Sequence, residues 1–160
     1  MFRPIRKVKN AISRQAALQL LHSARRGVLA LNGDDGYPYA IPINFYFNET
    51  DMTICFHGAR AGHKVDAMKA RDKVCFTVLG EEEVRCPEEA WAPHVKSVVV
   101  FGRCHPVEDP EEFHTLLKTF AMKYYPTEQM VDDEIRASGA HAAMYKIRIE
   151  HFSGKEVQEN

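Results

Sequence analysis

Residues 36–47 read GYPYAIPINFYF, and this stretch decides the fold class. Its odd-numbered residues are all aliphatic or aromatic, whereas the residues between them are mostly small or polar. An apolar period of two is typical of a β-strand with one face on a core, so we predict a strand over 37–47. Pro38 and Pro42 cannot donate backbone hydrogen bonds, which places this strand at a sheet edge or at a break in the pairing.

A second apolar run, at 28–32, precedes this strand. The connection Gly33-Asp34-Asp35-Gly36 predicts a hairpin turn between the two. Further upstream, apolar residues recur on one face of a helix predicted over 14–25. Ser13 is its expected N-cap and Gly27 its expected C-cap, and the basic residues just before Gly27 complement the helix dipole.

The rest of the chain continues with strands, turns and helical patterns. Helices are predicted from about Gly62 to Ala70 and from the capping-box sequence at 109–112, while 125–139 is polar and partly helical. The charged, proline-containing segment 81–94 is expected to be a loop or a short helical excursion. The six predicted strands span 28–32, 37–47, 52–57, 73–79, 96–107 and 143–151.

Six short strands with few helices between them predict a mainly β fold, a closed antiparallel barrel with flanking helices. The 160 residues fit a single domain over 1–160. With 21 basic and 22 acidic side chains, no overall field favours nucleic acid or an anionic membrane as a partner. Cys55 and Cys75 fall inside strand-like runs and no Cys-x-x-Cys pair occurs, so we expect free thiols and a reducing, cytoplasmic location.

The strand predicted over 96–107 has an unusual centre, because Val98 to Phe101 is apolar on both strand faces. A run of this kind is typical of a strand buried on both sides, at the middle of a barrel or under a partner chain. One chain of this length has limited means to cover both sides of an open barrel. We therefore expect a homodimer, the commonest symmetric assembly.

Three polar residues suggest where a ligand binds. Asn44, His57 and Thr77 each lie on the strand face opposite the bulky apolar residues of their own strand. On neighbouring strands they would line a common groove. Ordinary solvent-facing positions explain the same parity equally well, so the pattern alone leaves both interpretations open.

The segment Gly58-Ala59-Arg60-Ala61-Gly62-His63-Lys64 favours a phosphate ligand. Its small residues allow close approach of a ligand, and a helix start with a lysine in its first turn suits an anion. The chain has neither a Walker loop nor a Gly-x-Gly-x-x-Gly fingerprint, so nucleotide hydrolysis and a Rossmann site are disfavoured. His57 and His63 have no partners at metal-ligand spacing, so no metal site is expected.

Six segments, taken together and in order, resemble the FMN-binding split-barrel proteins related to pyridoxamine 5'-phosphate oxidase. Within that family the similarity is to the nitroimidazole-resistance (Nim-type) branch, and it extends over nearly the whole chain. The segments are residues 36–44, 54–59, 62–66, 73–78, 97–102 and 153–156.

The resemblance implies a six-stranded split barrel that forms a homodimer and holds two FMN molecules at the subunit interface. It implies that Lys64 and the loop at Gly58, Ala59 and His63 hold the phosphate. The isoalloxazine would lie along Ile43 and Asn44. The remaining implied site residues are Thr77 and Ser97 from neighbouring strands, and His57 as the catalytic residue near the flavin.

The resemblance also implies an oxidoreductase in which the flavin carries the chemistry. We expect reduction of a small acceptor, such as a nitroaromatic compound, by FMN that NAD(P)H or another donor has reduced. Two alternatives stay open: a flavin carrier without turnover, and a related barrel that binds haem through His57. The chain does not end in the basic segment expected of a true pyridoxamine 5'-phosphate oxidase, which disfavours that reaction.

Overall fold

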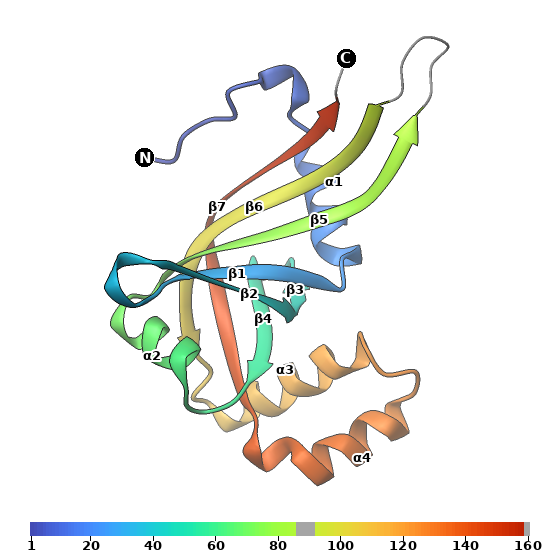
Figure 1. Ribbon diagram of the computed structural model, residues 1–160. Helices are drawn as coiled ribbons and strands as arrows, with labels where there is room; N and C mark the ends of the chain where they lie inside the picture. The colour runs from blue at the N-terminus through green and yellow to red at the C-terminus, as the bar shows by residue number, and fades with distance from the viewer. Residues whose placement is uncertain (86–91, 159–160) are drawn as a thin grey trace.

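The computed structural model describes residues 1–85 and 92–158. Its described strands form one antiparallel sheet in the order β2-β1-β5-β6-β7-β4-β3, which curls into a half-barrel (Figure 1). The expected mainly β fold with flanking helices is confirmed. The strands are β1 (Arg26–Asn32), β2 (Pro38–Asn44), β3 (Tyr46–Asn48), β4 (Thr53–Gly58), β5 (Lys73–Arg85), β6 (Ala92–Pro106) and β7 (Ala143–Gln158).

The described sheet has seven strands rather than six because the strand predicted over 37–47 is divided at Phe45. Its first part, β2, pairs with β1, and its second part, β3, pairs with β4. These two short strands form the opposite edges of the sheet, so the chain can connect them only if the sheet curls on itself. The prolines of β2 thus lie on an edge strand, as expected.

Tyr124 occupies the break between the two edge strands. Its hydroxyl accepts a hydrogen bond from the Phe45 N–H at 2.7 Å and lies 2.6 Å from two carbonyl oxygens, those of Phe45 and Arg25. The hydroxyl therefore supplies the partners that a neighbouring strand would otherwise give to Phe45. A residue from a turn far along the chain thus stabilises the break in the strand.

The hairpin predicted between the first two strands is confirmed. The Gly33 N–H donates to the Tyr37 carbonyl, and the Tyr37 N–H donates to the Asp34 carbonyl. Asp35 and Gly36 have positive φ angles of 54° and 81°, which suits a tight turn. Tyr37 itself remains 75% exposed, so the buried face of β2 begins only at Tyr39.

The helix predicted over 14–25 forms but ends two residues earlier. Ser13 caps it as expected, since its side chain accepts from the Ala16 N–H at 3.1 Å. The predicted C-cap is wrong: Gly27 belongs to β1, where an added Cβ would lie 2.3 Å from the Phe76 ring. Packing in the barrel, not helix capping, requires this glycine. The four α-helices of the described chain are α1 (Arg14–Ser23), α2 (His63–Ala70), α3 (Pro110–Met122) and α4 (Glu128–Ser138).

The helices cover the two ends of the barrel (Figure 1). Helix α1 packs against β5, β6 and β7, whereas α2, α3 and α4 gather at the other end. Asp109 caps α3 through the N–H groups of Glu111 and Glu112, which confirms the N-cap of the predicted capping box, whereas the Glu112 carboxylate pairs with Lys146. The inner face of α3 packs on the outside of β4 and β7, so these strands are covered on both faces. This second core consists of Cys55, Leu116, Leu117, Phe120 and Met144.

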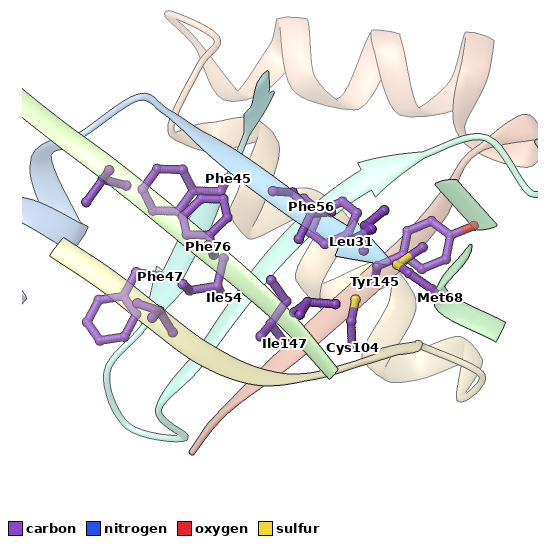
Figure 2. Packing of buried hydrophobic residues seen from close by; sticks show 14 of the residues in the cluster. Leu31, Phe45, Phe47, Ile54, Phe56, Met68, Phe76, Cys104, Tyr145 and Ile147 are labelled. Carbon is purple, nitrogen blue, oxygen red and sulfur yellow. The ribbon is translucent and has the colours of Figure 1, made fainter. Parts of the chain in front are cut away.

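The barrel interior is filled by aromatic and branched side chains that alternate along the strands (Figure 2). Phe45, Phe56 and Phe76 are all fully buried there, and the ring centroids of Phe45 and Phe76 are 4.9 Å apart. The predicted core parities of β4 and β5 are therefore confirmed. Cys55 is buried and Cys75 half-buried, and both are free thiols, as expected.

The centre of β6 is apolar on both faces, as the sequence indicates. Val98 and Val100 are fully buried inside the barrel. Phe101 points to the outer face and is 38% exposed, as are Val28 at 41% and Leu79 at 65% on the neighbouring strands. The outer face of β1, β5 and β6 therefore presents exposed apolar side chains.

The loop predicted over 81–94 is wrong where the structure describes it. The pairing of β5 with β6 continues beyond a bulge between Leu79 and Glu82, with Glu82 opposite Val95 and Glu83 opposite His94. The two strands project beyond the barrel there, where no core covers either face (Figure 1). Their sequence therefore lacks the alternation of apolar and polar residues by which a strand is predicted. Residues 86–91 of the predicted loop lie outside the described residues. Likewise β7 extends past its predicted end at 151, to Gln158.

Candidate functional site

The turn between β4 and α2 presents unpaired donors. Strand β4 ends at Gly58 and α2 begins at His63, after Gly62, whose φ of 114° is strained for residues with a side chain. The backbone N–H groups of His63 and Lys64 have no acceptor in the described part of the chain. Such free groups at a helix start favour an anion.

Lys64 extends from this helix start over the barrel end. Its Nζ lies 5.4 Å from the ring centroid of Phe56 and 5.8 Å from that of Tyr145. A Cβ at Gly58 would lie 2.5 Å from this Nζ, so a side chain at position 58 would displace the lysine end from its present place. The Tyr145 hydroxyl donates to the Ala59 carbonyl at 2.7 Å and holds the turn against the barrel.

The ammonium group of Lys64 has no ion-pair partner among the described carboxylates. It is half-buried, and desolvation lowers its pKa from the ordinary lysine value. A desolvated cation without a counter-ion is unfavourable in the free protein, and an anion bound beside it would relieve that.

His57 is the last residue but one of β4 and faces outward, toward α3. Its ring centroid is 4.9 Å from that of Phe120. Desolvation, and then the positive charge of Lys64, lower the pKa of His57 below its ordinary value of 6.5. The imidazole is therefore neutral at pH 7, with one ring N–H available as a hydrogen-bond donor.

The side chain of His63 is engaged away from the free N–H groups. Its ring stacks on Tyr39 at a centroid distance of 4.1 Å, and its Nε2 lies 3.3 Å from an Asp34 carboxylate oxygen. These contacts join α2 to the β1–β2 turn. His63 thus offers an anion its backbone N–H, while its imidazole fixes the helix in place.

Asn44 lies at the end of β2, close to the barrel seam. Its Oδ1 accepts a hydrogen bond from Arg26 Nε at 3.1 Å. Asn44 pairs with Arg26 across β1 and β2, and β2 comes into contact with β4 near this seam. Ile43, the preceding residue, is half-buried and packs against the barrel core.

Thr77 and Ser97 lie farther round the outside of the barrel. Thr77 on β5 is opposite Val28, which in turn is opposite Pro42 on β2. Two strand spacings, about 10 Å, therefore separate Thr77 from Pro42. Ser97 pairs with Leu79 and is only 7% exposed.

The structure therefore sorts the expected site residues into groups. His57, Gly58, Ala59 and Lys64 come together at the barrel end, whereas Asn44 lies at the end of β2 beside Arg26. Thr77 and Ser97 lie on the adjoining outer face. Asn44, His57 and Thr77 lie on β2, β4 and β5, and no two of these strands are neighbours in the sheet, so the expectation that the three residues lie on neighbouring strands is wrong.

Two arginines close to Asn44, Arg25 and Arg26, were not predicted as ligand-binding residues. Arg25 and Arg26 line a hollow of about 1060 Å³ that also contains Asn44 and Tyr124. The sequence places both arginines at the end of a helix, but α1 ends at Ser23 and Arg26 begins β1. No local pattern marks them, because Tyr124 reaches the hollow from nearly a hundred residues away.

A second hollow, of about 980 Å³, lies between α2, α3, α4 and the start of β7. None of the expected site residues is among its described lining residues. The apolar floor of the second hollow is formed by Val65, Met68, Phe113, Leu117, Ile135 and Tyr145.

In the described ranges, no three His, Cys, Asp or Glu side chains come together to hold a metal ion. No helix in those ranges is long and apolar enough to cross a membrane.

A family model described as pyridoxamine 5'-phosphate oxidase matches residues 13–156. The chain belongs to the pyridoxamine 5'-phosphate oxidase family. This membership confirms the split-barrel family predicted from the sequence motifs. No curated protein sequence matches the chain.

Solved structures share the family fold at low sequence identity. A candidate 5-nitroimidazole antibiotic resistance protein from Bacteroides thetaiotaomicron is 19% identical with a TM-score of 0.78, over 92% of this chain and 87% of its own. An FAD-binding protein from Mesorhizobium loti is 23% identical with a TM-score of 0.65, over 92% and 96%. An FAD- and haem-binding protein from Mycobacterium smegmatis is 21% identical with a TM-score of 0.74, over 95% and 74%.

Proposed function

We propose that this chain is an FMN-binding oxidoreductase that reduces a small acceptor, such as a nitroaromatic compound. The observation that carries the proposal is Lys64, a half-buried ammonium without a described counter-ion, in the first turn of a helix whose first two N–H groups have no described acceptor. A phosphate monoester fits this arrangement, because it accepts several charge-assisted hydrogen bonds at once. The glycine at position 58 keeps the approach to Lys64 open.

The outer face of the barrel suits the flat part of a flavin. Asn44 can hydrogen-bond the edge of a polar ring, while Pro42, Val28 and Thr77 offer small or branched side chains across three adjacent strands. The FAD-binding proteins with the same fold support a flavin at this kind of barrel. We propose FMN because a single phosphate suffices for the donors at Lys64.

A second copy of the chain would cover the ring. Val28, Leu79 and Phe101 leave a substantial part of their apolar surface exposed on the outer face. Exposed apolar side chains gathered on one sheet face are typical of an interface. In the proposed homodimer this face buries the flavin and keeps water from it.

The bound flavin supplies the electron transfer to the acceptor. Lys64 and the N–H groups of the α2 start hold the phosphate, and the Tyr145–Ala59 hydrogen bond keeps that turn in position. His57, with its lowered pKa, presents a neutral ring N–H toward the outside of the barrel. From there the neutral imidazole can donate a hydrogen bond to the acceptor, and the imidazolium that forms as the pH falls can donate a proton to it.

The visible spectrum of the purified protein tests the cofactor class. A flavin absorption band supports the proposal, whereas a Soret band would replace it with a haem-binding protein. Reoxidation of the dithionite-reduced protein by a nitroaromatic compound then tests turnover. A protein that binds flavin but transfers no electrons would be a carrier.

A further inference from the structure

The hollow beside Asn44 has a strongly positive wall. It lies between the end of α1, the start of β1 and the bulge of β5, and has a volume of about 1060 Å³. Arg25 and Arg26 both line it, and the acidic residue in its described lining is Glu81. No described carboxylate lies within 4.0 Å of either guanidinium, Glu81 included.

Both guanidinium groups are held in place by neighbours that leave their charge uncompensated. The Arg25 guanidinium lies 5.1 Å from the ring centroid of Tyr124. Arg26 Nε donates to Asn44, which leaves its terminal nitrogens without a described acceptor. A planar, pre-positioned guanidinium is suited to bidentate binding of a carboxylate or phosphate.

A third cation, Lys123, lies close enough to Arg25 to feel its charge. Lys123 donates from Nζ to the Ala24 carbonyl at 2.6 Å and lies 4.3 Å from the ring centroid of Phe45. Desolvation, and then the positive charge of Arg25, lower the pKa of Lys123 to about 8. The crowding of like charges is unfavourable in the free protein, and a bound anion would relieve it.

We propose that Arg25 and Arg26 bind an anionic group, a carboxylate or a phosphate, of the molecule that occupies the hollow beside the flavin. This inference rests on the proposed function, since the hollow adjoins Asn44, where the flavin ring is proposed to lie. The anionic group belongs either to the acceptor that is reduced or to the second phosphate of a dinucleotide flavin. Both share the chemistry that the arginines recognise.

The test compares two acceptors of similar size, 4-nitrobenzoate and the neutral 4-nitrobenzyl alcohol, with the FMN-loaded protein. We expect the double variant Arg25→Gln/Arg26→Gln to lower kcat/KM at least tenfold for the anionic acceptor, mainly through KM. The neutral acceptor should change less than twofold. Arg136→Gln, on the exposed side of α4, is the matched control and should change neither.

The second arm measures affinity for FMN and FAD by fluorescence titration of the apoprotein. If the anion is the second flavin phosphate, the double variant should lose at least tenfold in FAD affinity and keep its FMN affinity. Lysine replacements at both positions retain the charge and should preserve part of either effect. Thermal melting of each variant separates this loss from misfolding.

The outcomes are separable from those of the proposed function. A wild-type protein that binds no flavin contradicts the proposed function, and direct calorimetric binding of 4-nitrobenzoate still tests the arginines. A flavin-loaded protein in which the double variant treats both acceptors and both flavins like the wild type would overturn the anion site.

Discussion

The positive charge of Lys64 acts on His57 across the turn that joins β4 to α2. Desolvation alone lowers the pKa of this histidine, and the neighbouring ammonium adds to the effect. A phosphate bound at Lys64 would compensate that charge. The same two residues thereby connect the binding of the phosphate to the protonation of the imidazole.

For His57 we expect an effect on electron transfer rather than on flavin binding. The variant His57→Gln should retain FMN, because the imidazole faces α3 and not the free N–H groups of the turn. As the pH falls below 6.5 and the wild-type imidazole gains a proton, reoxidation of the variant by a nitroaromatic compound should become at least tenfold slower than that of the wild type, because a general acid contributes at least that much. Stopped-flow absorbance of the reduced flavin measures the rate.

The pH dependence sharpens this expectation. Since the pKa of His57 lies below 6.5, the histidine is neutral at pH 7 and gains a proton only as the pH falls. The wild-type rate should therefore rise below pH 6.5, while the rate of His57→Gln stays flat. Loss of FMN from the variant, with an unchanged rate per bound flavin, would instead make His57 structural.

At the scale of elements, the curl of the sheet depends on the break at Phe45, which Tyr124 of the α3 C-terminal turn stabilises. The variant Tyr124→Phe keeps the ring under Arg25 but leaves the Phe45 N–H without its partner. We expect a loss of about 1–3 kcal/mol in the free energy of unfolding. Urea denaturation measures it, with Tyr125→Phe as the control. Equal stability of the two variants would show that the break persists without the hydroxyl.

The elements differ in how far the sequence predicts them. The hairpin, the caps at Ser13 and Asp109, and the core parities of β4 and β5 follow from local patterns, and the structure confirms them. The prolines indicate an edge or a break in this strand, but the position of the break at Phe45 could not be predicted, because the alternation runs through it and the tyrosine that stabilises it is 79 residues away. The charged ends of β5 and β6 were missed since no core lies beneath them.

In the candidate site, too, some features follow from local sequence patterns and others depend on the fold. The loop from Gly58 to Lys64 is a local sequence feature, so the sequence alone could single it out as a proposed anion site. The separation of Thr77 from His57 depends instead on the strand order, which alternation along each strand does not reveal. Arg25 was missed because a helix end and a strand start have similar local patterns.

At the scale of the whole molecule, the exposed outer face of β1, β5 and β6 makes a homodimer the expected state. Sedimentation should give about twice the chain mass of 18.3 kDa. The variant Phe101→Glu places a charge on that face and should yield a monomer with at least tenfold weaker FMN binding. Met130→Glu, at an exposed methionine of α4, should remain a dimer. A monomeric wild type that binds FMN tightly would contradict the interface position of the cofactor.

The most direct test of the flavin proposal is the affinity of the apoprotein for FMN and for riboflavin, measured with the wild type and with Lys64→Ala. If Lys64 holds the phosphate, the variant should lose about 1.5–3 kcal/mol in FMN binding, roughly 10- to 150-fold in Kd. Riboflavin, which lacks the phosphate, should bind both proteins alike. Equal losses for the two ligands, or no loss for either, would contradict a phosphate site at Lys64.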